Sequence, residues 1–206
     1  MKLYELTQAP NPRRVRMFMA EKGIEIELIQ VNLMEAEHKS ENFLKKNPSG
    51  KIPVLELDDG TCIAESVAIC RYLEGVHPEP NLFGADPVEL GLIEMHNRMI
   101  ELELLSQIGV SWVNGPVVAR MAAGKFKQIP EAKAQSDTRV HDYYARLDTE
   151  LGEKEFIAAD RFTIADISAL IAIDFASQMV GLPPSESLNS LKRWHAEISN
   201  RPSASA

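Results

Sequence analysis

The chain has 206 residues, of which 45% are hydrophobic and 25% are charged, which is the composition of an ordinary globular protein. Its formal net charge of −8 argues against a broad nucleic-acid-binding surface. No apolar run approaches the roughly 18 residues of a membrane-spanning helix, and the N-terminus lacks the apolar stretch of a signal peptide.

The first 78 residues have the pattern of a thioredoxin-like α/β domain. Its elements follow the order βαβαββα, at residues 2–6, 11–23, 25–29, 38–47, 53–57, 61–64 and 66–74. Asn11 suits the N-cap of the first helix, Pro12 its first position and Gly23 its end. The Asp59-Gly60 pair predicts a tight hairpin between the last two strands.

Residues 79–86 are predicted to be a linker, and residues 87–206 an all-helical bundle domain, because prolines and glycines separate the two patterns. Two apolar stripes run along the first long helix, one through Leu92, Met95, Met99, Leu102, Leu105 and Ile108, the other through Ile93, Ile100 and Leu104. This surplus of apolar surface predicts a homodimer. Thr163 and Asp166 form a capping box before a helix that is apolar nearly all round and is expected to be buried.

An Ile52-Pro53 turn and a Glu65-Ser66 helix start flank the hairpin. A cis bond before Pro53 would leave the backbone N–H and C=O of Ile52 outside the strand ladder, where they can pair with an extended peptide. Ser66 at a helix N-terminus favours an anion, and the neighbouring Glu65 favours a cation. Adjacent sites of opposite preference fit the carboxylate and amine of an amino acid, so the predicted ligand is a short peptide with a free amino-acid end.

The stretch "NPSGKIPVLELDDGTCIAESVAICRYL" resembles the glutathione-site signature of cytosolic glutathione transferases, N-P-x-G-K-(I/V)-P-x-L followed by (E/D)-S-x-A-I-x-x-Y-L. The stretches "PNPRRVRMFMAEKG", "FIAADRFTIADI" and "WHAEISNRPSA" also resemble motifs of this family, so the resemblance spans almost the whole chain. It implies an enzyme that uses glutathione as a substrate, without a metal. The expected reaction is attack of the glutathione thiolate on a small electrophile, or reduction of a peroxide or disulfide.

The resemblance also implies roles for individual residues. Glu65 and Ser66 would hold the amine and carboxylate of the γ-glutamyl unit. Ile52, before Pro53, would pair through its backbone with the cysteinyl unit. The candidates for binding the glycine carboxylate are Lys51, Lys39 and His38. For the two lysines, an ordinary solvated side chain is the alternative.

The family often places serine, cysteine or tyrosine beside the glutathione sulfur, and this sequence does not. Ala9 and Pro12 stand where the serine and the cysteine would be, and Tyr4 comes too early in the strand. Asn11, preceded by proline, resembles bacterial and fungal subgroups in which an asparagine contacts the thiol. Its amide nitrogen can donate to a thiolate while its oxygen caps the helix, and pure capping is the alternative.

Three arginines lie near the start of the first helix. Arg13, Arg14 and Arg16 oppose the helix macrodipole. Either they form a solvated basic face, or Arg13 or Arg14 faces a bound anion or an acidic patch on a partner.

Helix register suggests an electrophile pocket built from the following residues: Thr7, Gln8, Met99, Glu103 and Trp112.

The sequence also bears on three functions other than conjugation. Isomerisation of a cis-dienoic keto acid usually comes with a Ser-Ser-Cys start, which Ala9-Pro10-Asn11 does not match. A non-catalytic glutathione-binding or regulatory protein on the same fold is the alternative from another class. A dithiol redox enzyme is disfavoured, because Cys62 and Cys70 form no CxxC motif and lie away from the first helix. Two buried thiols fit a reducing cytoplasm, and no His/Cys group has metal-ligand spacing.

Overall fold

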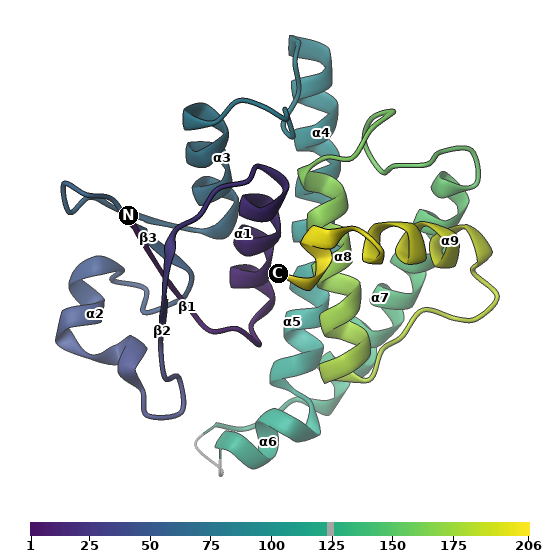
Figure 1. Cartoon of the computed structure of the whole chain (residues 1–206). Helices are drawn as coiled ribbons and strands as arrows, with labels where there is room; N and C mark the ends of the chain where they lie inside the picture. Colours follow the sequence, from purple (N-terminus) through teal and green to yellow (C-terminus); the bar gives the residue numbers. More distant parts are fainter. Residues whose placement is uncertain (123–125) are drawn as a thin grey trace. The chain divides into compact units, whose positions relative to one another are not determined.

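The computed structural model describes residues 1–122 and 126–206, which form two compact units. Unit 1 contains Met1–Leu82 and Arg201–Ala206, and unit 2 contains Phe83–Asn200 (Figure 1). The predicted fold class is confirmed, because unit 1 is a thioredoxin-like sheet with helices and unit 2 is helical. The sequence predicts residues 201–206 in the helical domain, but they join unit 1, where Arg201 forms a 2.7 Å ion pair with Glu21.

The sheet of unit 1 has the strand order β2-β1-β3-β4. Its strands are β1 (Lys2–Glu5), β2 (Glu27–Gln30), β3 (Val54–Glu56) and β4 (Cys62–Ala64). β1 pairs parallel with β2 and antiparallel with β3, and β3 pairs antiparallel with β4. Leu3 and Leu55, which are partners in the ladder, are both fully buried, so the centre of the sheet carries the core of this unit.

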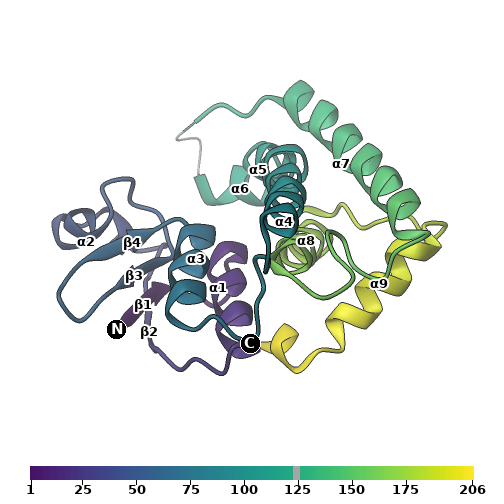
Figure 2. The same ribbon diagram turned by 90° about the horizontal axis from the view of Figure 1, so that it is seen from above.

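Helices cover both sides of this sheet. They are α1 (Pro10–Glu21), η1 (Glu37–Lys39), α2 (Glu41–Lys46), α3 (Ser66–Val76) and η4 (Pro202–Ser205). α1 and α3 lie together on one face and α2 lies on the other side (Figure 2). The predicted helix at 38–47 is divided, because the Ser40 side chain accepts a hydrogen bond from the Phe43 N–H and starts α2.

The predicted N-cap of the first helix is wrong. Ala9 is the N-cap of α1 and Pro10 is the first residue of the helix, so Asn11 is its second residue. Proline is well suited to the first position, since its missing N–H would have no partner there. The Asn11 side-chain oxygen accepts instead from the Arg14 guanidinium, at 3.2 Å.

Unit 2 is built from helices alone in its described part. They are α4 (Pro87–Met99), η2 (Ile100–Leu105), α5 (Ser106–Val113), α6 (Pro116–Ala122), α7 (Pro130–Leu151), α8 (Ile164–Phe175), η3 (Ala176–Val180) and α9 (Asn189–Ser199). The capping box of Thr163 and Asp166 is confirmed, and α8 is buried along almost its whole length. Among the described helices, none combines the length and the apolarity that crossing a bilayer requires.

The two apolar stripes of the first long helix have different environments. Ile93, Ile100 and Leu104 are fully buried, whereas the other stripe exposes Leu92 and Leu102. The stripes run through α4 and η2, and the first one continues to Ile108 in α5. η2 is a π-helical segment that changes the helix register. Unit 2 therefore packs on the second stripe and leaves much of the first at the surface of the chain.

Candidate functional site

A small cavity of 90 Å³ in unit 1 gathers most of the residues singled out from the sequence. It is lined by Asn11, Asn47, Lys51, Ile52, Pro53, Glu65 and Ser66. These residues come from the start of α1, the loop before β3 and the start of α3. Apart from Asn47, each is a residue that the sequence predicts in the glutathione site.

The loop before β3 is held in place by Asn47, which the sequence reasoning missed. Its side chain is 6% exposed, donates to the Lys51 carbonyl at 2.8 Å and accepts from the Ser49 N–H at 3.1 Å. The Ile52-Pro53 bond that follows is cis, and β3 begins after it at Val54. The Asn-Pro pair that opens the quoted signature is the sequence feature that points to Asn47.

The start of α3 presents two different side chains to the cavity. Glu65 is the N-cap residue and has φ 67° and ψ 117°, a backbone conformation that non-glycine residues rarely adopt. Such strain costs about 1–3 kcal/mol and is commonly kept at binding sites. Ser66 is the first residue of the helix and is 5% exposed, whereas Glu65 is exposed. The helix N-terminus favours an anion near Ser66.

Arg14 lies beneath this cavity and is 1% exposed. One nitrogen of its guanidinium donates to the Ser66 hydroxyl oxygen at 2.5 Å and to the Asn11 amide oxygen at 3.2 Å. For Arg14, the expectations of a solvated basic face and of an acidic patch on a partner are therefore wrong, whereas the alternative of a nearby bound anion stays a prediction. A buried cation instead links the two polar side chains that α1 and α3 bring to the cavity.

The other two arginines of α1 also have partners inside unit 1. Arg13 donates to the Ala204 carbonyl at 2.9 Å. Arg16 forms a buried ion pair with Glu5 and donates to the Thr7 carbonyl at 2.9 Å. The middle of α1 is buried on all sides, which explains why charged side chains in this helix are paired internally.

Lys39 and His38 do not line the cavity. The Lys39 ammonium lies 3.3 Å from both the Ser49 and Gly50 carbonyls, so it borders the loop that carries Lys51. Gly50 has φ +59°, and a Cβ there would lie 2.8 Å from the His38 carbonyl, so the loop can approach η1 only with glycine. Burial lowers the pKa of His38, and the nearby Lys39 charge lowers it further.

The residues predicted for the electrophile pocket have the following surroundings within each unit. In unit 1, Thr7 donates from its hydroxyl to Gln30 at 3.1 Å, and neither Thr7 nor Gln8 lines the 90 Å³ cavity. In unit 2, Trp112 packs edge-on against Phe175, with ring centroids 5.3 Å apart, and Met99 is half-buried.

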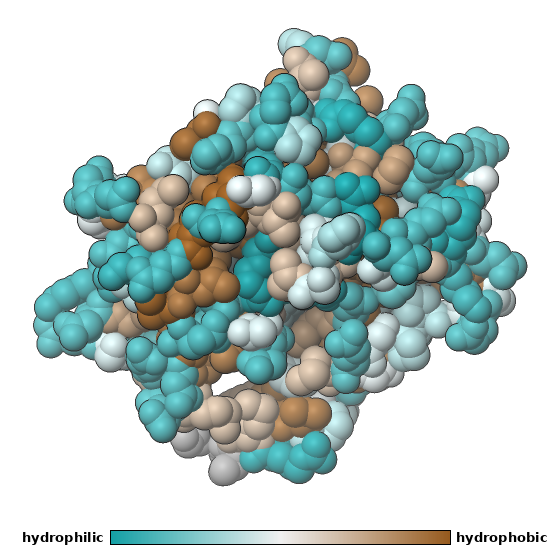
Figure 3. Space-filling model, viewed as in Figure 1, coloured by the Kyte–Doolittle hydropathy of each residue, from teal (hydrophilic) through white to brown (hydrophobic). Residues whose placement is uncertain are grey.

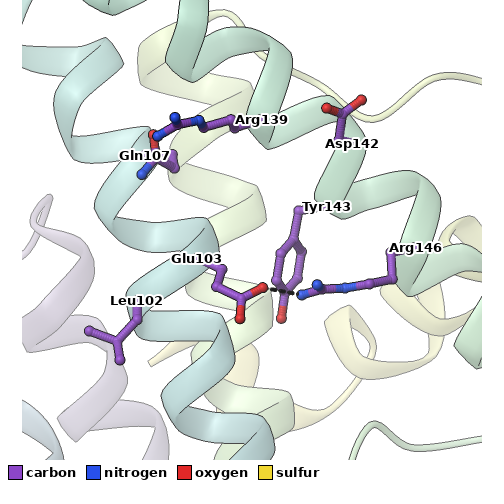
Figure 4. Close-up of a pocket in the computed structure, with 7 residues that line it drawn as sticks. All are labelled: Leu102, Glu103, Gln107, Arg139, Asp142, Tyr143 and Arg146. Carbon is purple, nitrogen blue, oxygen red and sulfur yellow. Dashed lines mark hydrogen bonds and ion pairs between the residues drawn. The ribbon is translucent and has the colours of Figure 1, made fainter.

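Glu103 lines a larger cavity of 470 Å³ in unit 2, which contains neither Met99 nor Trp112. Its carboxylate pairs with Arg146 at 2.6 Å beside the Tyr143 ring (Figure 4). Burial raises the pKa of the Tyr143 hydroxyl to about 12, against the lowering effect of Arg146. Of the three residues of unit 2 that helix register had grouped, only Glu103 lines this cavity, and the predicted electrophile pocket stays a prediction.

A third hollow, of 450 Å³, lies between α1 and β2 in unit 1 and is mostly apolar. Side chains of Met19, Ile24, Ile26 and Leu28 line it, and hydrophobic side chains gather over β2 and α1 on the face shown in Figure 3. This groove has little polar lining and offers no obvious chemistry.

Cysteine and metal chemistry are not prominent in the described residues. Cys62 and Cys70 are free thiols, and neither lines the 90 Å³ cavity. Cys70 is buried as predicted, whereas Cys62 is only half-buried, so the prediction of two buried thiols is wrong for Cys62. No group of three or more His, Cys, Asp or Glu side chains is arranged to hold a metal ion in residues 1–122 and 126–206.

Comparison with known proteins gives matches over nearly the whole chain. Residues 1–75 match the family model "Glutathione S-transferase, N-terminal domain", and residues 116–202 match "Glutathione S-transferase, C-terminal domain". The chain is 36% identical to "Glutathione S-transferase 2" of Saccharomyces cerevisiae, over 98% of this chain and 87% of that protein.

Two further similarities differ in extent. A crystal structure of a glutathione S-transferase domain-containing protein from Marinobacter aquaeolei VT8 is similar with a TM-score of 0.92 and 38% identity, over 98% of this chain and 99% of that one. "Maleylacetoacetate isomerase" of Pseudomonas aeruginosa is 38% identical, but over only 43% of this chain and 42% of that protein.

Proposed function

The chain belongs to the glutathione S-transferase family, and we propose that its 90 Å³ cavity is the inner part of the site where it binds glutathione. The protein is a glutathione transferase, and its similarity to an enzyme of this family extends over nearly the full length of the chain. The main support for this site is that one cavity is lined by Asn11, the Ile52-Pro53 turn and the Glu65-Ser66 pair.

The cavity would hold one end of the tripeptide rather than the whole molecule. A volume of 90 Å³ leaves room for several water molecules, which suits an amino-acid head group. In our proposal the γ-glutamyl carboxylate binds Ser66 at the α3 N-terminus, and the amine binds Glu65. The cysteinyl unit pairs with the Ile52 backbone, and the glycine carboxylate extends past Lys51 toward Lys39.

Asn11 is proposed to stabilise the glutathione thiolate. A carboxamide does not titrate near neutral pH, so its contribution is a hydrogen bond and not proton removal. Lowering a thiol pKa by two units requires about 2.7 kcal/mol, which a donor and the partial charge of the α1 N-terminus can together supply. The thiolate then attacks an electrophilic carbon and forms a carbon–sulfur bond. In a substitution the leaving group departs with its bonding electron pair, and in an addition the π electrons move to an atom that then takes a proton from water.

The same thiolate chemistry extends to disulfides and peroxides without a protein nucleophile. None of the seven cavity residues is a cysteine. Reduction of a disulfide would therefore proceed by attack of the glutathione sulfur, release of the other sulfur as a thiolate, and attack on the mixed disulfide by a second glutathione.

Calorimetric titration with glutathione tests the site. Ser66→Ala should weaken binding by about 1–3 kcal/mol, as expected for loss of a hydrogen bond to a charged group. Ser187→Ala, in an exposed loop of unit 2, is the matched control and should leave the affinity unchanged. Equal affinities for wild type and Ser66→Ala would remove Ser66 from the site.

We also propose a homodimer in the cytoplasm. Along α4 and η2, Val88 is 71% exposed and Leu102 is 59% exposed, and a second copy of the chain would cover this apolar stripe. The cytoplasmic location is supported by the free thiols of Cys62 and Cys70, which fit a reducing compartment. Light scattering should give twice the 23.0 kDa mass of one chain, and a mass of one chain at micromolar concentration contradicts the dimer.

A further inference from the structure

We propose that Arg14 is a positioning residue of the glutathione site, which turns the Ser66 hydroxyl and the Asn11 amide toward the ligand. The inference rests on the proposed function, because it concerns how that site is prepared for glutathione. Arg14 itself does not line the cavity, so it acts through its two neighbours.

The contacts of Arg14 restrict what the two neighbours can do. A guanidinium has five N–H donors, no acceptor, and a charge that persists at all ordinary pH values. The Asn11 atom that faces it at 3.2 Å must therefore be the amide oxygen, and the amide nitrogen points away from Arg14. Ser66 accepts from Arg14 through its oxygen at 2.5 Å, so the Ser66 proton must also point elsewhere.

Both neighbours line the cavity, so both of these donors become available to a ligand there. A glutathione carboxylate and a glutathione thiolate are both acceptors. With Arg14 in place, Ser66 and Asn11 meet them as hydrogen-bond donors without having to reorient. The bond from a charged donor also polarises the Asn11 amide, which strengthens the hydrogen bond that its nitrogen can donate.

The charge of Arg14 adds to this orientation effect. The guanidinium is 1% exposed, so water screens its field much less than at the surface. Negative charge on a ligand in the cavity is favoured by this cation, while Glu65 is exposed at the start of α3, where an amine can bind it. A purely structural Arg14 would connect α1 to α3 and affect stability alone.

The test separates ligand positioning from stability. Arg14→Met removes the donors and the charge at similar volume, and Arg13→Met is the matched control on the same helix. Urea unfolding first establishes that each variant is folded. Calorimetry with S-methylglutathione, which has no ionisable thiol, reports on the carboxylate contact. The ultraviolet absorbance of the bound thiolate, followed against pH with glutathione, reports on the thiol.

We expect Arg14→Met to bind S-methylglutathione about tenfold more weakly and to raise the pKa of the bound glutathione thiol by about one pH unit. Arg13→Met should leave both quantities unchanged, because its partner is the Ala204 carbonyl. Combining Arg14→Met with Ser66→Ala should weaken S-methylglutathione binding by less than the two single effects together, because the two residues act through one contact.

Two outcomes overturn different statements. A folded Arg14→Met protein with wild-type affinity and wild-type thiol pKa overturns the role of Arg14 and leaves the glutathione site standing. A wild-type protein that binds no glutathione overturns the proposed site itself. If Arg14→Met does not fold, Arg14→Lys and Arg14→Gln are compared, and the charged variant must show the lower thiol pKa for the inference to survive.

Discussion

Buried polar side chains are arranged in opposite ways in the two units. In unit 2, the fully buried Asp166 accepts hydrogen bonds from the Ile157 and Thr163 N–H groups and from the Trp194 indole, at 2.9–3.1 Å. In unit 1, Arg14 joins Asn11 and Ser66, and these two also line a cavity. The first network is closed by the protein, whereas the second leaves room for a ligand to complete it.

Burial alone therefore does not distinguish a structural polar residue from a functional one, and the hydrogen-bonding capacity left for a ligand does. The Thr163 hydroxyl donates a fourth hydrogen bond to Asp166, at 3.2 Å. A carboxylate whose oxygens already accept four hydrogen bonds has little capacity left for a substrate. Asp166 is therefore a structural residue, although it is as deeply buried as any active-site acid. If this contrast between a closed and an open network holds, substitutions in unit 2 should affect stability alone, whereas substitutions beside the cavity of unit 1 should affect glutathione chemistry.

Asp166→Ala should destabilise the protein by about 3–4 kcal/mol, because it removes one half of the α8 capping box and leaves the Trp194 indole N–H buried without an acceptor. Urea unfolding measures this loss. Glutathione affinity of the folded fraction should not change. A variant that keeps its stability but loses affinity would show that the network of unit 2 is functional after all.

Asn11→Ala should slow conjugation about ten- to a hundredfold at pH 7, or about 1.4–2.7 kcal/mol of activation free energy, because the thiolate loses a hydrogen-bond donor. The deficit should shrink as pH rises, since hydroxide then supplies the thiolate. Asn11→Asp should be slower still, because it places a negative charge beside the sulfur. Full pH–rate profiles of both variants are the measurement.

The alternative for Asn11 is a purely structural role. An Asn11→Ala protein with the wild-type pH–rate profile but a lower melting temperature would establish that role. Thiol activation would then fall to backbone N–H groups or to Thr7.

The contact between α1 and the C-terminal segment predicts a pH dependence of stability. Burial raises the pKa of Glu21, but hydrogen bonds from Arg201 and Ser203 outweigh it, and the pKa is lowered below its ordinary 4.5. Because the folded-state pKa is depressed, the stabilisation is fully present above that ordinary value and is lost as pH falls through the folded-state pKa.

Glu21→Gln measures this contribution. Arg201 is 35% exposed, so screening limits the loss at neutral pH to about 1 kcal/mol. The difference in unfolding free energy between wild type and variant should disappear in acid. A difference that stays constant from neutral to acid pH would mean that the carboxylate charge is irrelevant to this contact.

Glu103→Gln should have the smallest effect. Its pair with Arg146 is nearly half exposed on both sides, at 48% and 42%, so we expect a stability change of about 0.5 kcal/mol or less. Glutathione affinity should be unaffected, as Glu103 belongs to unit 2 and the proposed site to unit 1. A clear loss of affinity would assign the 470 Å³ cavity a part in binding.

Sequence alone determined the features that depend on neighbours close in the chain. The capping box of Thr163 and Asp166 spans three residues, and the Asp59-Gly60 turn and the cis Ile52-Pro53 bond involve adjacent ones. Backbone conformation and capping hydrogen bonds act over such short distances, so residue type and spacing predict them. The βαβαββα order and most of the cavity residues followed from these local patterns.

The partners of the charged residues of α1 depend on tertiary packing. Asn11 and the arginines looked like a helix cap and a basic surface, because periodicity reveals which faces are apolar but not what packs against a charge. Arg14 meets Ser66 across 52 residues of sequence, and Glu21 meets Arg201 across 180. A buried charge is stable only beside a partner, and chain folding brings that partner from a distance that no local pattern encodes.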